Sequence, residues 1–377
     1  MIYLDYAANT PVEKDVLKSF VSATNKFIAN PNSSHPLGIE AKKEIDRCTD
    51  SIASYFNISK DSVIYTSGSS ESNNLAIKGV ALRNKDKGRH IIISSIEHSS
   101  VVAPVNYLTS IGYEVNVISI LKNGKVDLEE LKNTIRDDTI LVSVCYVDSE
   151  LGTIQPIKEI GEIVKKYPNC LFHTDATQAV GKINVDFSNC DFVTFAPHKF
   201  YGLNGFGVLL NINDEKIVPI IHGGKSTTIY RSGTPVTANV VALEKALSIA
   251  LDNLNDRYDY ISGLNKYLKD ELSIFSNVVI NSPKNSIPNT INFSLKNMDA
   301  KKVVSELAKN GIYLSTTSAC SLGNTPSKSV YAITNDLELA KNSIRISISH
   351  LTTLEELEEF IDFFKNIYDK ELNNESN

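Results

Sequence analysis

The chain has 377 residues, of which 42% are hydrophobic and 22% charged, and its formal net charge is −6. This length favours two domains that share an interface over a single core. The mild acidity gives no broad electrostatic footprint for nucleic acid, so we expect no direct nucleic-acid partner. No segment is apolar for long enough to span a membrane, and the first residues lack the pattern of a secretory signal. We therefore expect a cytoplasmic protein.

The cysteines of the chain are scattered, without a CxxC pair or a Cys/His cluster. They are Cys48, Cys145, Cys170, Cys190 and Cys320. This spacing offers no set of metal ligands, so we expect no metal site. We expect all of them except Cys320 to be reduced structural thiols.

Short runs rich in Val, Ile, Tyr and Phe predict strands at 63–66, 90–96, 113–120, 140–147, 170–174, 191–195 and 207–212. Several are apolar almost throughout, which is typical of strands buried on both faces. Amphipathic helices lie between them, for example at 157–167. The alternation predicts a mostly parallel sheet that is covered by helices on both sides.

The pattern changes after a long helical segment at 238–262. Strand patterns then follow at 278–282, 290–295, 312–316 and 343–349, and a last helix is expected to start near Thr353. These elements predict an α/β fold with a large, mostly parallel-sheet domain and a smaller α+β C-terminal domain. We place the large domain at 13–255 and the small domain at 1–12 together with 256–377.

The first candidate site follows the predicted strand 63–66. Ser69 and Ser70 stand there in the run TSGSSESNN, at the start of a predicted helix. Backbone N–H groups at a helix start bind anions with the help of the helix dipole, so this run is a candidate phosphate cradle. It lacks the lysine of a GxxxxGK[ST] loop. An ordinary serine-rich helix cap is the alternative, and the run alone does not decide between them.

A histidine and an aspartate follow two further strands. His98 stands after strand 90–96, where a hydrogen-bonded structural histidine is the alternative interpretation. Asp175 follows strand 170–174, and a buried carboxylate there needs a partner because burial without one is costly. A pyridinium N–H would satisfy it and would keep a cofactor ring protonated. A helix-capping aspartate is the alternative.

Lys199 follows the apolar strand 191–195, in the segment APHKFYGLNGFG. Removal from water lowers the pKa of a lysine and favours the neutral amine that forms a Schiff base. The glycines after Lys199 do not fit the GxGxxG pattern, so we exclude a Rossmann-type NAD site. A phosphate cradle, a histidine, an aspartate and a lysine in this order predict one cofactor that is held from all sides.

Motifs along nearly the whole chain resemble one family. They are YLDYAANTPV (3–12), NPNSSHPLG (30–38), TSGSSESNNLAIKG (66–79), ELGTIQPI (150–157), DATQAVGK (175–182), HKFYG (198–202), HGG (222–224), RSGT (231–234), SAC (318–320) and SIRIS (343–347). By these motifs the chain resembles a class V aminotransferase-fold protein, specifically a NifS/IscS-type cysteine desulfurase. The resemblance implies a pyridoxal 5'-phosphate (PLP) enzyme of aminotransferase fold type I.

The resemblance also implies how PLP would be held. Lys199 would carry it as a Schiff base, and Asp175 would pair with its pyridine nitrogen. Gln178 would contact its phenolic oxygen. His98 would stack on the ring and assist proton transfer. Ser149 would stand where the family has an asparagine that reaches towards the cofactor.

By the same resemblance, the phosphate and the substrate would be bound by residues from several segments. Ser69, Ser70 and His198 would bind the phosphate. Thr234 would add a phosphate contact across a subunit interface, which implies a homodimer. Arg345 would hold the substrate carboxylate as a bidentate fork. A surface charge is the alternative for Arg345, but the surrounding apolar run SIRISIS disfavours it.

Cys320 carries the function-specific expectation. It stands in the small, polar segment 316–324, which we expect to be a mobile loop. As a thiolate it would attack the sulfur of a cysteine–PLP adduct, leaving L-alanine and a persulfide on Cys320. The persulfide would pass to a sulfur-acceptor protein, in an iron–sulfur cluster or tRNA-thiolation pathway. An idle exposed thiol is the alternative.

Three places depart from the family pattern. Ala196 and Pro197 stand where a serine and a small residue are usual, so one phosphate hydroxyl is missing and the backbone is stiffer. The usual Asn-Asn-Glu reads Asp-Ser-Glu at 148–150. The segment after Cys320 is about one residue shorter. These differences bear on PLP affinity and on the choice of substrate.

Two other functions stay open. One is a different PLP reaction: a selenocysteine lyase, another class V lyase, or a transaminase in which Cys320 is incidental. Alkylation of Cys320 separates these, because it should stop desulfuration and barely affect transamination. The other is a cofactor-poor, non-catalytic scaffold relative, against which visible absorbance of bound PLP would argue.

Overall fold

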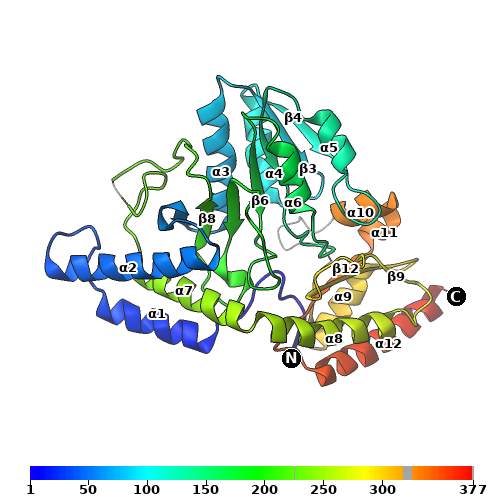
Figure 1. The fold of residues 1–377 in the computed structure, drawn as a ribbon. Helices are drawn as coiled ribbons and strands as arrows, with labels where there is room; N and C mark the ends of the chain where they lie inside the picture. The colour runs from blue at the N-terminus through cyan, green and yellow to red at the C-terminus, as the bar shows by residue number, and fades with distance from the viewer. Residues whose placement is uncertain (225, 317–324, 376–377) are drawn as a thin grey trace.

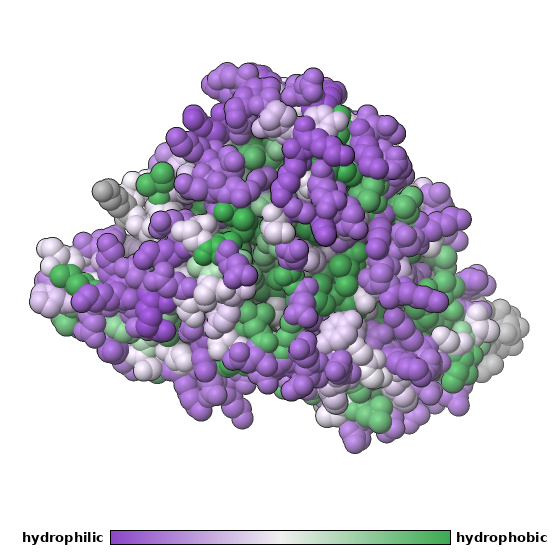
Figure 2. Space-filling model, in the orientation of Figure 1, coloured by the Kyte–Doolittle hydropathy of each residue, from purple (hydrophilic) through white to green (hydrophobic). Residues whose placement is uncertain are grey.

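The computed structural model describes residues 1–224, 226–316 and 325–375. Figure 1 shows a larger part built around a central sheet and a smaller part beside it, which contains both ends of the described chain. Figure 2 shows a mostly hydrophilic face, with hydrophobic side chains gathered near its centre. Of the described helices, none is long and apolar enough to cross a membrane.

The central sheet has seven strands in the order β2-β8-β7-β6-β5-β3-β4. Neighbouring strands from β7 to β4 run parallel, and β8 is antiparallel to both β2 and β7. The prediction of a mostly parallel sheet is therefore confirmed. Its strands are β2 (Val63–Thr66), β3 (His90–Ser94), β4 (Glu114–Ile118), β5 (Thr139–Ser143), β6 (Leu171–Asp175), β7 (Phe192–Phe195) and β8 (Gly207–Asn211).

Helices cover both faces of this sheet because successive strand residues point to opposite sides. Ile92 packs in one hydrophobic cluster with α6 and α7, whereas Ile91 and Ile93 pack in another with α3 and α4. Strands β2, β3, β5, β7 and β8 are buried throughout, as continuous apolar strands predict, whereas β4 at the edge of the sheet is largely exposed. The helices of this part are α1 (Lys14–Lys26), α2 (Pro36–Tyr55), α3 (Ser69–Asn84), α4 (Ser99–Ser110), α5 (Leu128–Thr134), α6 (Ile157–Val164) and α7 (Thr237–Asp252).

The helix expected at 238–262 is two helices, so the prediction of one continuous helix is wrong. α7 ends at Asp252, and α8 (Leu254–Leu272) begins after Asn253. The Asn253 side chain donates a hydrogen bond to the Ile249 carbonyl at 2.8 Å. Such local side-chain bonds compete with helical backbone pairing, and the apolar spacing does not reveal them. Figure 1 shows α7 under the large sheet and α8 continuing into the smaller part.

The smaller part is built on an antiparallel sheet of order β12-β10-β9 and a second pair, β1 with β11. Its core combines Ile2 and Leu4 with side chains of α8, β10 and α12. The first residues thus pack with the C-terminal part, while the exact domain boundaries stay a prediction. The remaining elements are β1 (Ile2–Tyr3), β9 (Val278–Ile280), β10 (Thr290–Leu295), α9 (Ala300–Lys309), β11 (Ile312–Tyr313), α10 (Lys328–Thr334), α11 (Leu337–Lys341), β12 (Ser343–Ser347) and α12 (Leu354–Glu375).

Candidate active site

An open cavity of about 290 Å³ lies where residues following β2, β3, β5, β6 and β7 meet β12. This is the place at which open α/β sheets bind ligands. Most of the predicted site residues line it together: Ser69, Ser70, His98, Ser149, Asp175, Gln178, His198, Lys199 and Arg345. Thr234 instead lines a separate hollow with Arg231 and Phe206. Cys320 lies outside the described residues.

Asp175 ends β6 with its side chain almost buried, at 7% exposure. One carboxylate oxygen accepts a hydrogen bond from Asn73 Nδ2 at 2.7 Å, and the other accepts one from the Thr177 N–H at 3.0 Å. Both donors are neutral. The carboxylate therefore enters the cavity without a cationic partner among these contacts, which suits it to pair with a positively charged ring N–H.

A short chain of hydrogen bonds joins Asp175 to His98 through Asn73 and Ser100. Asn73 Nδ2 also donates to Ser100 Oγ at 2.8 Å, and Ser100 Oγ lies 2.7 Å from His98 Nδ1. The Ser100 N–H donates to the same ring nitrogen at 3.2 Å, so Nδ1 is an acceptor. Burial lowers the pKa of His98, so its ring is neutral near pH 7 and carries its proton on Nε2.

Asn73 is a site residue that the sequence reasoning missed. It is fully buried on α3 and stands four residues after Ser69, on the same helix face. This helical spacing was the available signal. Asn73 thereby fixes the Asp175 carboxylate relative to Ser100 and, through it, to His98.

The start of α3 lines the cavity. Ser69 and Ser70 begin the helix, and Thr177 Oγ1 donates to Ser69 Oγ at 3.0 Å. Gly207 of β8 passes so close to Gly68 that an added Cβ would lie 2.4 Å from the Gly68 carbonyl carbon. Glycine is therefore required at 207 to keep the helix start beside the sheet, and the helix N-terminus attracts an anion.

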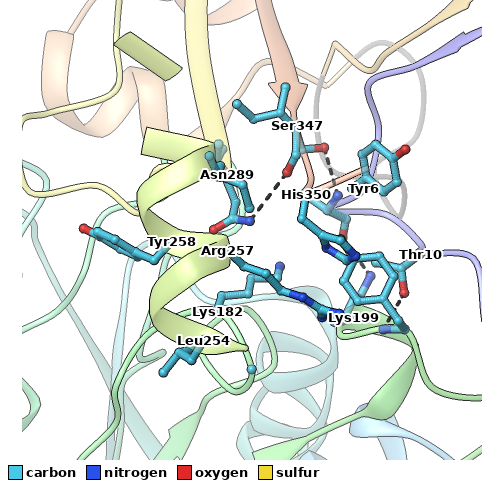
Figure 3. Close-up of a pocket in the computed structure, with 16 residues that line it drawn as sticks. Tyr6, Thr10, Lys182, Lys199, Leu254, Arg257, Tyr258, Asn289, Ser347 and His350 are labelled. Atoms are coloured by element: carbon cyan, nitrogen blue, oxygen red, sulfur yellow. Dashed lines mark hydrogen bonds between the residues drawn. The ribbon is translucent and has the colours of Figure 1, made fainter. Parts of the chain in front are cut away.

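Lys199 approaches the cavity from the turn after β7. Its ammonium donates to the Ala7 carbonyl at 2.9 Å and to the Ala8 carbonyl at 2.5 Å. The N-terminal segment thus forms the wall against which the lysine rests. On its other side Lys199 lines a second, smaller pocket with Lys182, Arg257 and His350 (Figure 3).

Arg345 is 1% exposed on β12, and it still lines the cavity. It forms an ion pair with Asp5 at 2.8 Å and donates to the Ser149 carbonyl at 3.1 Å. Asp5 also accepts a hydrogen bond from Ser315 Oγ at 3.0 Å. Asp5 was missed as a site residue because its partner stands 340 positions away and no local pattern links them.

Two of the residues that depart from the family pattern, Ala196 and Asp148, are buried. Ala196 is fully buried and does not line the cavity. Asp148 accepts a hydrogen bond from Ser329 Oγ at 2.9 Å, and Glu150 accepts one from Ser327 Oγ. We call these four residues the α10 clasp, because they join the segment after β5 to the start of α10. The clasp fixes the element that follows the Cys320 segment.

Comparison with known proteins shows the family to which this fold belongs. The family model of class-V aminotransferases matches residues 2–360. A protein of Dictyoglomus turgidum named cysteine desulfurase IscS is 38% identical over 98% of this chain and 95% of its own length. Two solved structures superpose over nearly the whole fold. One is a NifS-like protein (TM-score 0.92, 32% identity, 98% of this chain and 99% of that chain). The other is SspA in complex with cysteine (TM-score 0.82, 31% identity, 94% and 100%).

The match spans both the large and the small part of the molecule. It includes the strand ends that carry Asp175 and Lys199 and the strand that carries Arg345. The α/β architecture expected from the sequence is confirmed by these neighbours. The chain belongs to the class-V aminotransferase family, within its NifS/IscS-like group.

Proposed function

We propose that this protein is a PLP-dependent cysteine desulfurase, which converts L-cysteine to L-alanine and leaves a persulfide on Cys320. One observation carries the proposal. Asp175 and Lys199 follow neighbouring parallel strands and line the same cavity, with the start of α3 at its edge. The names of the curated relatives, cysteine desulfurase IscS among them, support the same reaction.

The residues around the cavity fit PLP. Asp175, which accepts its described hydrogen bonds from neutral donors, would pair with the pyridine nitrogen, and Gln178 would face the phenolic oxygen. Ser69, Ser70 and His198 would hold the phosphate, and Thr177 supports Ser69. Lys199 would bind the cofactor covalently. When bound, PLP supplies an electron sink that lets bonds at the amino-bearing carbon of a substrate break.

Three side chains would handle the substrate. Arg345, already oriented by Asp5 and by the Ser149 carbonyl, would bind the carboxylate of L-cysteine. His98, neutral and held at Nδ1 by Ser100, would move a proton at Nε2. The Ala7 and Ala8 carbonyls would hold the Lys199 amine whenever it is not joined to the cofactor.

Cys320 would take the sulfur. The carbon–sulfur bond of L-cysteine breaks and a sulfur–sulfur bond forms on Cys320. The carbon that carried the sulfur gains a proton, which gives L-alanine. The persulfide would then pass to an acceptor protein of iron–sulfur cluster assembly or tRNA thiolation. We also propose a homodimer in which Thr234 contacts the phosphate held by the other subunit, which agrees with its position outside the cavity of its own chain.

The test is the release of sulfide and alanine from L-cysteine in the presence of a reductant. Native protein should release both, whereas Lys199→Ala should release neither. Cys320→Ala should bind PLP with its normal visible absorbance and yet lose sulfide release. Normal sulfide release by Cys320→Ala would show that the persulfide mechanism is wrong.

A further inference from the structure

Lys182 is a lysine in an unusual environment. It lies in the turns that follow β6, and its ammonium donates a hydrogen bond to Gln178 Oε1 at 2.5 Å. The residue is only partly exposed, and burial lowers the pKa of its ammonium to about 7. The charged groups that act on it, Lys199 and Arg345, are both cations.

The described part of the chain offers no counter-ion to offset the cost of placing this lysine here. Within residues 1–224, 226–316 and 325–375, no carboxylate forms an ion pair with Lys182, and its hydrogen-bond partner is a neutral amide. A cation that is largely removed from water without a counter-ion destabilises a fold. Such a residue is a candidate for a functional role.

Lys182 and Gln178 lie in different cavities. Gln178 lines the large cavity that holds Asp175 and Lys199, but Lys182 does not. Lys182 lines the smaller pocket of Figure 3. A ligand in the large cavity therefore meets Gln178, and any influence of Lys182 on that ligand's hydrogen bonds passes through the Gln178 amide.

The contacts of Gln178 fix which way its amide faces. An ammonium has only donors, so the amide oxygen must face Lys182. The amide nitrogen donates to the Ala7 carbonyl at 3.0 Å. A flipped amide would oppose donor to donor at Lys182 and acceptor to acceptor at Ala7. Gln178 is thus held with its NH₂ group as the donor.

We infer that Lys182 is a positioning residue, which locks the Gln178 amide so that it offers an N–H donor to an anionic oxygen of a ligand in the large cavity. The inference rests on the proposed function, which gives that ligand as PLP and that oxygen as the phenolic one. Lys182 also places a positive charge behind the donor, which strengthens its hydrogen bond to an anion.

The test is a double-mutant cycle on PLP affinity with Lys182→Met and Gln178→Met. PLP binding to the cofactor-free proteins is followed by visible absorbance, independently of turnover. Lys182→Met should raise the dissociation constant about two- to tenfold, the loss expected for one weakened hydrogen bond. In the Gln178→Met background the same change should have little effect, because the residue through which it acts is missing.

A pH series separates positioning from a general structural role. Native affinity should fall more steeply from pH 6 to pH 8 than that of Lys182→Met, because only the native protein loses the Lys182 charge. Cofactor-free Lys182→Met should unfold at the same or a higher temperature, since an uncompensated charge is removed. Lys182→Gln provides the same comparison if the methionine variant does not fold. Lys266 is exposed and paired with Asp270, so Lys266→Met is the control. It should change neither PLP affinity nor the unfolding temperature.

Equal PLP affinity in native protein and Lys182→Met would overturn the inference. So would a loss of the same size in both Gln178 backgrounds, because Lys182 would then act without Gln178. The proposed function fails differently. If native protein binds PLP and shows the coupling but releases no sulfide from L-cysteine, the desulfurase proposal is wrong and the inference stands. If native protein binds no PLP, both are wrong.

Discussion

Arg345 shows at the scale of single residues how the fold prepares a binding group. A buried guanidinium must be paired, and here the partner, Asp5, is supplied by the other end of the chain. Arg345 Nε has no hydrogen-bond partner among the described residues. The contacts with Asp5 and the Ser149 carbonyl fix the direction of the guanidinium and use one N–H of each terminal nitrogen, so the second N–H of each is left as a donor.

Substitution of Asp5 should destabilise the protein through Arg345. Asp5→Asn leaves the guanidinium without its counter-charge, and the free energy of unfolding should fall by about 3 kcal/mol. The double variant Asp5→Asn with Arg345→Met should recover part of this loss, because no charge stays buried. Denaturant unfolding of the cofactor-free proteins measures both. An unchanged stability in Asp5→Asn would show that the pair contributes nothing.

Glu97 should make stability depend on pH. Burial raises its pKa to about 8, well above the value of about 4.3 in an unfolded chain. The folded state therefore holds this proton more tightly, so the stability that Glu97 contributes is complete below pH 4 and is lost as the pH rises through 8. Glu97→Gln keeps an oxygen that can accept from Ser94 Oγ and the Cys145 N–H.

The stability of Glu97→Gln relative to native protein should therefore rise by about 2–4 kcal/mol between pH 4 and pH 8. Chemical unfolding at a series of pH values measures this difference. Glu129→Gln, on the exposed face of α5, is the control and should show no such trend. If the unfolding free energies of Glu97→Gln and native protein change with pH in the same way, the raised pKa of Glu97 is contradicted.

At the scale of elements, the α10 clasp joins two segments that are far apart in sequence. Ser327 caps α10 by accepting from the Val330 N–H at 3.1 Å, and it also donates to Glu150. Leu151 and Val330 pack together beside these contacts. Burial, together with the neighbouring charge of Glu150, raises the pKa of Asp148 to about 7. The clasp is thus a set of buried hydrogen bonds at the root of a short helix.

Removal of the serine hydroxyls of the α10 clasp should destabilise α10 more than the rest of the fold. Ser327→Ala should lower the free energy of unfolding by about 1–3 kcal/mol, because it removes a cap and a hydrogen bond to a carboxylate. Ser329→Ala should cost less, since it removes one contact. Hydrogen exchange of the α10 amides should accelerate in both, and in neither should the β6 amides change. Ser262→Ala is the control, because Ser262 is partly exposed on α8 and bonds only to the Tyr258 carbonyl among the described residues. Unchanged α10 exchange would show that the clasp does not anchor the helix.

At the scale of the whole molecule, the N-terminal segment packs in the core of the smaller part and also contacts the larger part. Its first residues pair with β11, Asp5 holds Arg345, and the Ala7 and Ala8 carbonyls hold Lys199. Deletion of residues 1–8 should therefore lower the unfolding temperature and weaken PLP binding at least tenfold. Thermal unfolding and PLP titration measure the two effects. A truncated protein that binds PLP as native protein does would contradict this role.

The sequence predicts the elements well where information is local, and most of the residues that it singles out line one cavity. Apolar runs gave the strands, and polar residues after those runs gave Asp175, His98 and Lys199, because parallel strands deliver their ends to one edge. Partners set by tertiary contact were not predictable: Asp5 for Arg345, Ser329 for Asp148, and the Ala7 carbonyl for Lys199. The break at Asn253 was hidden because the apolar spacing continues through it.

Lys199 follows β7 of the large sheet, whereas Arg345 stands on β12 of the smaller one. The Ser149 carbonyl, which follows β5, accepts a hydrogen bond from Arg345 at 3.1 Å and so joins the two parts beside the cavity. The spacing between the amine and the guanidinium is therefore set by the way the two parts pack against each other. That spacing limits the length of the amino acid that fits between them.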